Sequence, residues 1–317
     1  MWAYIIARLL RAIPLLFGIS LVVFALIHAA PGGPFTVYLS NPNVTPEDIE
    51  RLEKSLGLDR PLPVQYVSWL WGFVRGDWGY SYVDGRAVLD RILERAPATL
   101  ELMGSAFVLA LIVALLLGGA AAMRQRGWTD RIISGFSIVG ISLPTFWLGL
   151  IAQLVFAVEL RWLPTAGRMG PTGGDRLAYL VLPVATLGLF YAASWIRYVR
   201  ASLSETLSQD FIRAGRARGV ADAKLLFVHA LPNAIFPLIT VLALDFALLF
   251  SGAIVTETVF SWPGMGTLLL DSVYRRDYSV LMGILMASSA LIVFSNLTAD
   301  ITYGFLDPRV RVTGARK

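Results

Sequence analysis

The sequence has no cysteine, and its only lysines are Lys54, Lys224 and Lys317. The lack of cysteine excludes a disulfide framework and thiol chemistry. A phosphate-binding P-loop needs the pattern Gly-x-x-x-x-Gly-Lys-Ser/Thr, in which backbone N–H groups and the lysine hold the phosphates. None of the three lysines stands in that pattern. The chain therefore cannot power a process with ATP by itself in the P-loop manner.

Basic residues are also absent from six long apolar stretches, although the chain has 27 of them. A helix rises about 1.5 Å per residue, so about 20 apolar residues cross a membrane core of roughly 30 Å. Each stretch must be helical, because lipid offers backbone N–H and C=O groups no partner. We therefore predict an all-α membrane protein with six transmembrane helices, at residues 12–30, 102–123, 132–158, 177–196, 231–256 and 278–299.

Two prolines and one acidic residue lie within or near the ends of these spans. Pro144 and Pro183 are predicted to kink their helices rather than to end them. Asp245 lies in the middle of the 231–256 span, where a charge that faces lipid is costly. Its carboxylate should therefore face the interior of the bundle, a partner subunit or a water-filled path.

The distribution of basic residues between the spans predicts the orientation of the chain. The N-terminus, the connections at 123–131 and 197–228 and the C-terminus together carry 15 of the 27 basic residues, concentrated next to span ends. The opposite connections carry 12, and seven of these lie in one long segment that has little weight in the positive-inside rule. Both termini are thus expected in the cytoplasm. The net charge of +5 reflects this bias, and we expect no nucleic acid as a partner.

Residues 31–96 form a segment outside the membrane that is short for an independent domain. A capping-box pattern begins at Thr45 and a helix-ending glycine follows at Gly57. Apolar residues at helical spacing predict a second helix around 67–74 and a third at 88–95, ended by a proline. These short helices either only cap the bundle or shape a vestibule where a partner delivers substrate.

The connection at 197–230 is the longest one on the cytoplasmic side. It has two short helical patterns separated by Gly219, and Asp210 stands near the positive end of the first, where an acid is favoured. Small residues alternate with arginines along this first pattern, so another helix or backbone can approach it closely. Composition alone favours an ordinary basic loop that obeys the positive-inside rule.

The order of residues in this loop, Asp210-Phe-Ile-Arg-Ala-Gly-Arg-Ala-Arg-Gly219, resembles the cytoplasmic EAA-type motif of ABC importer permeases. Further segments are similar to the peptide-transporter branch of that family and follow in the same order along the chain. They lie at 56–63 with Gln65 and Tyr66, and at 76–81, 142–147, 229–237, 257–266, 276–278 and 306–309. Together they identify the chain as similar to the B-type permease, the transmembrane subunit of a dipeptide/oligopeptide ABC importer.

Two positions depart from the pattern of that family. The family usually has Pro-Gly-Asp-Pro after the first span, whereas this chain has Pro31-Gly-Gly-Pro34, so the acidic residue and its role are absent. In the loop motif a position that is usually alanine is Gly215. Glycine weakens a helix by roughly 1 kcal/mol relative to alanine but remains small, so docking should survive.

The resemblance implies a type I ABC importer permease fold in the inner membrane of a bacterium. We expect an N-terminal transmembrane helix at 1–30 and the extracytoplasmic segment at 31–96. The permease core follows at 97–304, with a cytoplasmic coupling loop at about 200–229, and residues 305–317 form a cytoplasmic tail.

The resemblance also implies partners. These are a second, related permease, two ABC ATPase subunits that bind ATP and Mg²⁺, an extracytoplasmic solute-binding protein, membrane lipid and a short peptide as substrate. The chain itself would hold no cofactor and would be no enzyme. Each permease of the family inserts its loop helix into a groove of one ATPase, and the residues expected to do so here are Asp210, Ala214, Gly215, Arg218 and Gly219.

A second set of residues is expected along the translocation pathway or at its outer gate. The set consists of Ser142, Pro144, Asp245, Glu257, Trp262 and Gly264. Glu257 is expected near the membrane interface, and the segment from Glu257 to Gly264 is expected to fold back toward the bundle. Asp245 either lines the pathway or pairs with a polar group of the partner subunit.

Other functions remain as alternatives. An ion-coupled secondary transporter would need coupling acids near mid-membrane, often in a repeated pattern, and only Asp245 stands there. A purely structural membrane subunit is a further alternative, as is an importer of the same family for a nickel complex, glutathione or an oligosaccharide. A zinc enzyme is disfavoured, because His28 and His229 fall on opposite predicted faces of the membrane and no His-Glu-x-x-His pattern exists.

Overall fold

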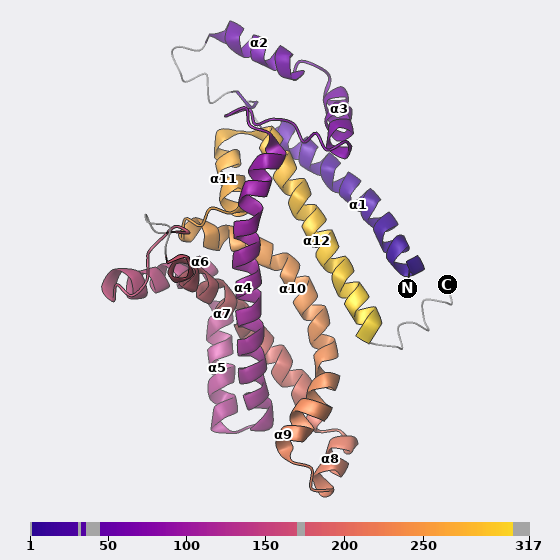
Figure 1. The fold of residues 1–317 in the computed structure, drawn as a ribbon, viewed down its shortest axis with the longest axis vertical. Helices are drawn as coiled ribbons and strands as arrows, with labels where there is room; N and C mark the ends of the chain where they lie inside the picture. The colour runs from indigo at the N-terminus through magenta and orange to yellow at the C-terminus, as the bar shows by residue number, and fades with distance from the viewer. Residues whose placement is uncertain (1, 31–32, 36–44, 170–174, 307–317) are drawn as a thin grey trace. The chain divides into compact units, whose positions relative to one another are not determined.

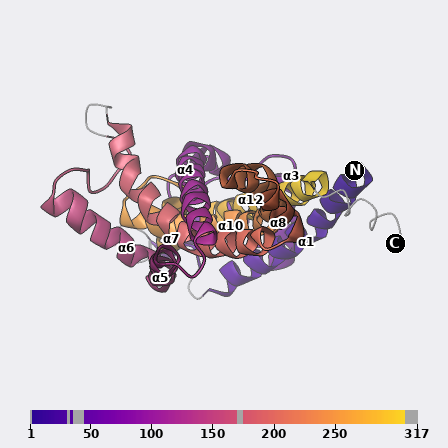
Figure 2. The ribbon, with the colours of Figure 1, turned by 90° about the horizontal axis from the view of Figure 1, so that it is seen from below.

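The computed structural model describes residues 2–30, 33–35, 45–169 and 175–306. These residues fall into two compact units. The first comprises the described residues of 99–263 and 294–306, and the second those of 2–98 and 264–293. Helices make up both units, and among the described residues the β-structure is limited to one isolated bridge between Tyr80 and Ala87 (Figures 1 and 2).

The second unit carries the chain's first helices and the expected short helices outside the predicted spans. Its helices are α1 (Trp2–Ala29), α2 (Pro46–Leu56), α3 (Leu62–Val74), the start of α4 (Val88–Met123), α11 (Met265–Arg275) and the start of α12 (Tyr278–Leu306). The capping box of α2 is formed as predicted, because the Thr45 side chain accepts a hydrogen bond from the Asp48 N–H and Asp48 reaches back to the Thr45 N–H. Gly57 ends α2 in the left-handed region, with φ of 70°.

The first unit contains the remaining helices. These are the rest of α4, α5 (Trp128–Ser142), α6 (Thr145–Ala152), the π-helix η2 (Gln153–Glu159), α7 (Arg176–Leu207), α8 (Asp210–Ala217), α9 (Asp222–Lys224), the π-helix η3 (Leu225–Ala230), α10 (Leu231–Val259) and the end of α12. Helices α8 and α9 form the connection between α7 and α10, which is the predicted cytoplasmic loop (Figure 1).

The predicted all-helical membrane fold is confirmed, and the number of spans stays a prediction. Four helices among the described residues are long and apolar enough to cross a membrane, namely α1, α4, α7 and α12. A fifth span results if α5 and the helix that runs from Thr145 to Glu159 are counted together. The remaining predicted span, at 231–256, coincides with α10, a helix of 29 residues.

The structure corrects the prediction that Pro144 only kinks a helix. The chain bends by 103° between Ser142 and Thr145, so the predicted span at 132–158 is broken. Leu143 and Pro144 are both extended there, because proline disfavours the helical conformation for the residue before it. Pro183, in contrast, lies inside α7 without ending it.

The structure also corrects the separate short helix expected at 88–95. Helix α4 begins at Val88 and continues through Pro97 to Met123, so the predicted boundary at 96/97 falls inside a helix. Val88 and Ile92 are buried, and both pack closely against Gly283 of α12. Burial of this apolar face favours the helix on the N-terminal side of Pro97. The packing therefore outweighs the tendency of the proline to end a helix.

Small residues allow the helices of the first unit to approach one another. A Cβ atom at Gly118 of α4 would lie 2.7 Å from Val199 Cβ and 2.9 Å from the Ile196 carbonyl oxygen of α7. At Gly188 of α7 it would lie 3.0 Å from the carbonyl oxygen of Ala106 in α4. Without a hydrophobic driving force between helices in lipid, such close backbone approach is a main source of helix association.

The adjacent glycines of α4 allow a matched test of this packing. We predict that Gly118→Ala destabilises the protein by about 1–3 kcal/mol, because the added methyl group meets backbone and a stiff β-branched side chain. Gly119→Ala should be neutral or stabilising, because no other atom lies within 4 Å of a Cβ there. Thermal unfolding of both purified variants in detergent measures the difference. Equal unfolding temperatures would show that α4 and α7 do not meet at Gly118.

Candidate functional site

Helix α8 is a short helix with one buried side chain and an otherwise exposed surface. It begins at Asp210 and ends at Ala217, and the side chain of Ile212 is fully buried. Gly219 follows with φ of 76°, a conformation that glycine adopts without strain, and its N–H donates to the Arg216 carbonyl oxygen at 2.9 Å. The predicted break between the two helical patterns therefore stands at Gly219.

Contacts to the chain that follows hold α8 in place. The Arg216 Nε donates to the Asp222 Oδ1 at 3.1 Å, and the Val220 N–H donates to the Gly215 carbonyl oxygen at 3.2 Å. Both partners of the ion pair are more than half exposed, so water screens it and its contribution to stability is small. The buried Ile212 side chain and the packing of Leu225 supply the main anchor.

The coupling residues expected from the sequence do not all face outward. Asp210, Ala214, Arg218 and Gly219 are exposed, and they form a small charged and apolar surface. Gly215 is half-buried instead, because a Cβ there would lie 2.6 Å from the Leu225 Cδ2. That atom is the end of a flexible side chain and can move, which explains why an alanine at this position, as the family usually has, is compatible with the same packing.

Two polar contacts join α7, which leads into the loop, to α10 and to α5. The Ser202 hydroxyl of α7 donates to the Ala234 carbonyl oxygen of α10 at 2.7 Å. Arg200 of α7 donates from both Nε and Nη2 to the carboxylate of Asp130 at the start of α5. A two-point guanidinium–carboxylate contact fixes direction as well as distance. Helices α5, α7 and α10 are therefore coupled close to the loop.

A hollow of about 470 Å³ lies beside α8. Its wall is more polar than apolar and carries arginines from two connections. The lining residues are Ala122, Met123, Arg124, Gln125, Leu207, Ser208, Arg213, Arg216, Asp222, Leu225 and Leu226. The loop therefore presents the exposed face of α8 with this hollow beside it.

A second site surrounds Glu257 near the end of α10. The Glu257 side chain is fully buried, and its Oε1 accepts a hydrogen bond from the Thr99 hydroxyl of α4 at 2.5 Å. This burial is within the protein, so the expected position of Glu257 near the membrane interface stays a prediction. A buried carboxylate needs partners, because its desolvation is otherwise costly. The backbone also closes here, since the Trp262 N–H donates to the Glu257 carbonyl oxygen at 2.8 Å.

The chain after η2 wraps around this segment. The Gln153 side chain donates to the Thr165 carbonyl oxygen at 2.7 Å and to that of Val259 at 3.0 Å. The Gly167 N–H donates to the Phe260 carbonyl oxygen at 2.8 Å. Phe260 is buried within this packing, and the turn after α10 is therefore held firmly within the first unit.

An ionic cluster lies next to this turn. The Arg168 guanidinium stands 5.7 Å from the centre of the buried Trp262 ring, within the range of a cation–π contact. Arg168 and Arg176 also donate to the Glu101 carboxylate of α4, at 2.9 and 2.5 Å. Sequence reasoning singled out Trp262 but missed Thr99, Glu101 and both arginines, because these contacts join positions far apart in the chain.

The remaining residues expected along the pathway belong to different elements. Asp245 is half-buried in α10 and accepts a hydrogen bond from the Trp195 Nε1 of α7 at 2.6 Å. Ser142 is exposed at the end of α5, where its hydroxyl donates to the Ile138 carbonyl oxygen at 2.8 Å, and Pro144 precedes α6. Gly264 belongs to the second unit, where it precedes α11.

The second unit contains a buried carboxylate that sequence reasoning also missed. Asp277 accepts hydrogen bonds from the Ser81 hydroxyl at 2.5 Å, the Tyr82 N–H at 3.1 Å and the Arg91 guanidinium at 3.4 Å. The contact between Ser81 and Asp277 joins the segments at 76–81 and 276–278, which the resemblance had matched separately. Burial and the nearby charge of Asp277 raise the pKa of Tyr82 to about 12, so this phenol stays neutral.

A neighbouring acid completes the cluster. Burial acts to raise the pKa of Asp84, but the hydrogen bond from the Arg86 N–H and the charges of Arg91 and Arg86 leave that pKa below its ordinary value. Asp84 is therefore charged at neutral pH and shares Arg91 with Asp277. Across the part of the chain that the structure describes, no group of three or more acidic or histidine side chains could hold a metal ion.

Comparison with protein families finds two matches that together cover residues 1–312. A family described as "Binding-protein-dependent transport system inner membrane component" matches residues 88–312. A family described as the N-terminal part of a binding-protein-dependent transport system membrane component matches residues 1–103. The first match alone covers more than half of the chain, including α8 and both polar sites of the first unit.

Known relatives are similar over nearly their whole length. An oligopeptide transport system permease protein, AppB of Bacillus subtilis, is 39% identical over 98% of this chain and 99% of its own. A putative peptide permease of Brucella ovis is 38% identical over 99% of this chain and 100% of its own. The glutathione transport system permease protein GsiC of Escherichia coli is 39% identical over 97% of this chain and 98% of its own.

Solved structures show the same fold at lower identity. A chain of the MetNI methionine ABC transporter in an inward-facing conformation matches with a TM-score of 0.58. The match covers 69% of this chain and 97% of that one, at 17% identity. The likeness shows the fold, which is that of a type I ABC importer permease.

The contacts of Asp277 lead to a local prediction. We expect Asp277→Ala to speed amide hydrogen exchange across residues 79–91 by at least about tenfold, because the Tyr82 N–H, the Ser81 hydroxyl and Arg91 lose a shared buried acceptor. Asp271→Ala is the control, since Asp271 is an exposed acid on α11. Unchanged exchange in the Asp277 variant would mean that the carboxylate does not hold this segment.

Proposed function

Because this chain belongs to the family of binding-protein-dependent transport system inner membrane components, we propose that it forms half of the translocation pathway for short peptides in an ATP-driven importer. The chain is a membrane permease subunit of a binding-protein-dependent ABC importer. The observation that carries the proposal is the similarity to AppB, which extends over 98% of this chain and 99% of AppB.

The cargo is proposed from the shared chemistry of the relatives' substrates. The names of two relatives refer to peptides, and that of a third, equally similar relative refers to glutathione. Glutathione is itself a tripeptide, so all three names describe small molecules with amide bonds and free carboxylates. A short peptide is therefore the substrate class that these similarities favour, ahead of a nickel complex or an oligosaccharide.

The proposed complex divides its tasks among several proteins. Two ABC ATPase subunits bind ATP and Mg²⁺, because this sequence has no P-loop of its own. A second, related permease forms the other half of the pathway, and an extracytoplasmic binding protein delivers the peptide. Both termini lie in the cytoplasm in this proposal, residues 31–96 lie outside, the core spans 97–304 and the tail is 305–317.

The coupling step is proposed to act through α8. Asp210, Ala214, Arg218 and Gly219 offer an exposed surface to a groove on one ATPase, and Gly215 supports that surface from beneath. The contacts from Ser202 to α10 and from Arg200 to α5 join the loop base to three helices. Movement of the ATPases would therefore move these helices together and alternate the access of the pathway.

The pathway itself is proposed to involve residues at the break between α5 and α6 and polar residues within the first unit. The broken helix at Ser142 and Pro144 frees backbone groups that only protein or water can satisfy in a membrane. Asp245, Glu257 and Trp262 supply polar or aromatic groups within the first unit, and Gly264 precedes α11. The segment that leads from Glu257 to Gly264 acts as part of the outer gate in this proposal.

Reconstitution tests the function directly. The chain, its permease partner and both ATPase subunits are purified together and placed in liposomes. We expect ATP hydrolysis to rise on addition of the binding protein loaded from a peptide mixture, and labelled peptide to accumulate inside. Uptake that persists without ATP but collapses with an ion gradient would contradict the proposal in favour of a secondary transporter.

Two substitutions test the coupling loop. Ala214→Trp should abolish stimulated ATP hydrolysis, because a bulky side chain prevents close approach of the exposed α8 surface. Gly219→Pro should have the same effect, because proline cannot adopt φ of 76° and removes the N–H that bonds to Arg216. Stimulated ATPase activity in liposomes is the measurement.

Ala214→Ser is the matched control for these variants, because it keeps the side chain small. Its stimulated ATPase activity should equal that of the unaltered complex. The yield and gel-filtration profile of each variant show whether it inserts into the membrane. Normal stimulation in both the Ala214→Trp and Gly219→Pro complexes would contradict the assignment of the loop.

A further inference from the structure

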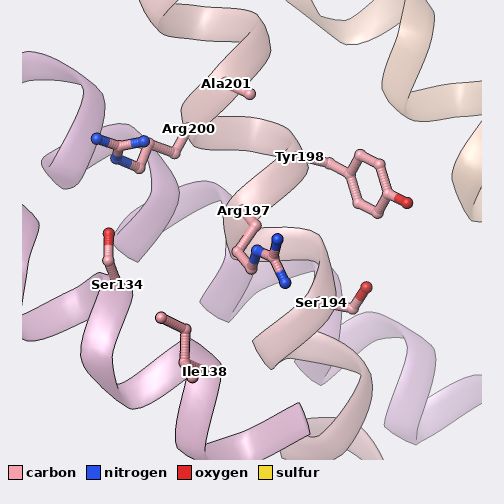
Figure 3. Close-up of a pocket in the computed structure, with 7 residues that line it drawn as sticks. All are labelled: Ser134, Ile138, Ser194, Arg197, Tyr198, Arg200 and Ala201. Carbon is pink, nitrogen blue, oxygen red and sulfur yellow. The ribbon is translucent and has the colours of Figure 1, made fainter.

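A cavity of about 510 Å³ lies between α5 and α7 in the first unit (Figure 3). Its lining residues are Ser134 and Ile138 of α5 and Ser194, Arg197, Tyr198, Arg200 and Ala201 of α7. Arg197 follows directly on the predicted span at 177–196. The cavity therefore lies where the apolar part of α7 gives way to basic residues, which is the level predicted for a membrane surface.

The charges of this cavity do not cancel within it. Arg200 is held by the carboxylate of Asp130, with an Nη2–Oδ2 distance of 2.8 Å and a second contact from Nε. The same carboxylate accepts hydrogen bonds from the Arg126 N–H at 2.9 Å and the Ser134 hydroxyl at 3.3 Å. Asp130 thus has a full set of partners, and the charge of Arg200 is neutralised.

Arg197 supplies the remaining positive charge. It is exposed and makes no hydrogen bond or ion pair with any other residue in the described part of the chain. Its guanidinium group lies toward Ser194 in the cavity, whereas Arg200 points to the other side (Figure 3). The hydroxyls of Ser194 and Tyr198 are likewise without a partner among the described residues. A guanidinium with hydroxyls beside it binds an oxyanion in two-point fashion.

The surroundings of the cavity favour an oxyanion that is joined to apolar chains. Ile138 lines the cavity and is 60% exposed, and its neighbours on α5, Phe136 and Val139, are 76% and 57% exposed. An apolar surface therefore continues from the polar cavity along α5. A soluble anion would gain nothing from this surface, whereas acyl chains would cover it.

We propose that this cavity binds the phosphate group of an anionic phospholipid, with Arg197 as the main contact and the acyl chains along α5. Basic pockets between transmembrane helices on the cytoplasmic side are suited to anionic headgroups. The inference rests on the proposed function only in taking this end of α7 as the cytoplasmic membrane surface. The ligand chemistry follows from the uncompensated arginine and its hydroxyl neighbours.

Lipid binding to the purified complex of permeases and ATPases tests the proposal. The complex is depleted of lipid and titrated with phosphatidylglycerol or with phosphatidylcholine, and native mass spectrometry counts the lipids that stay bound. Arg197→Gln should weaken phosphatidylglycerol binding about fivefold, the effect expected of one basic residue near an anionic surface. Binding of phosphatidylcholine should be weak and unchanged.

Arg131→Gln is the matched control, because Arg131 is an exposed arginine of α5 that does not line the cavity. An equal loss of phosphatidylglycerol in both variants would overturn the proposal, since it would reflect attraction to the surface as a whole. Displacement of the lipid by inorganic phosphate or by a dipeptide would also overturn it and assign the cavity to a soluble oxyanion. The readout needs no transport, so a complex that binds the lipid but imports nothing would count against the proposed function alone.

Discussion

Lipid offers no partner to a backbone N–H or C=O group, and this constraint determines how the chain is built. The predicted spans that the structure describes are helical apart from the break at Leu143 and Pro144. Helices α4 and α7 approach each other at Gly118 and Gly188, where side chains are absent. Polar side chains inside the protein are tolerated where another group meets them. Glu257 has the Thr99 hydroxyl, and Asp245 has the indole N–H of Trp195. Close backbone packing and paired polar groups therefore explain the fold together.

The same pairing principle operates where the helices leave the apolar region. Arg200 and Asp130 fix α7 to α5, and Ser202 fixes α7 to α10 close to the base of the loop. In the second unit, Asp277 accepts hydrogen bonds from the Ser81 hydroxyl and the Arg91 guanidinium. A loop that is anchored in this way can transmit force to several helices at once, and this is the physical basis of the proposed coupling through α8.

Local signals in the sequence predicted local features well. The capping box at Thr45 and the end of α8 before Gly219 depend on neighbouring residues and were predicted correctly. The continuation of α4 through Pro97 was missed, because packing of Val88 and Ile92 decides it. The burial of Glu257 and the contact between Ser81 and Asp277 could not be predicted, because their partners lie 158 and 196 positions away. The coupling residues came from the resemblance, and only the structure revealed that Gly215 packs inward.

The central claim is that the exposed face of α8 contacts an ATPase subunit. The chain has no native cysteine, so a single introduced cysteine reports on one position. The most direct measurement is crosslinking from Ala214→Cys in the assembled complex, with Arg51→Cys on α2 as the comparison. A crosslink to the ATPase is expected from position 214 and none from position 51. A stable complex in which position 214 crosslinks only to the second permease, or to nothing, would contradict the claim.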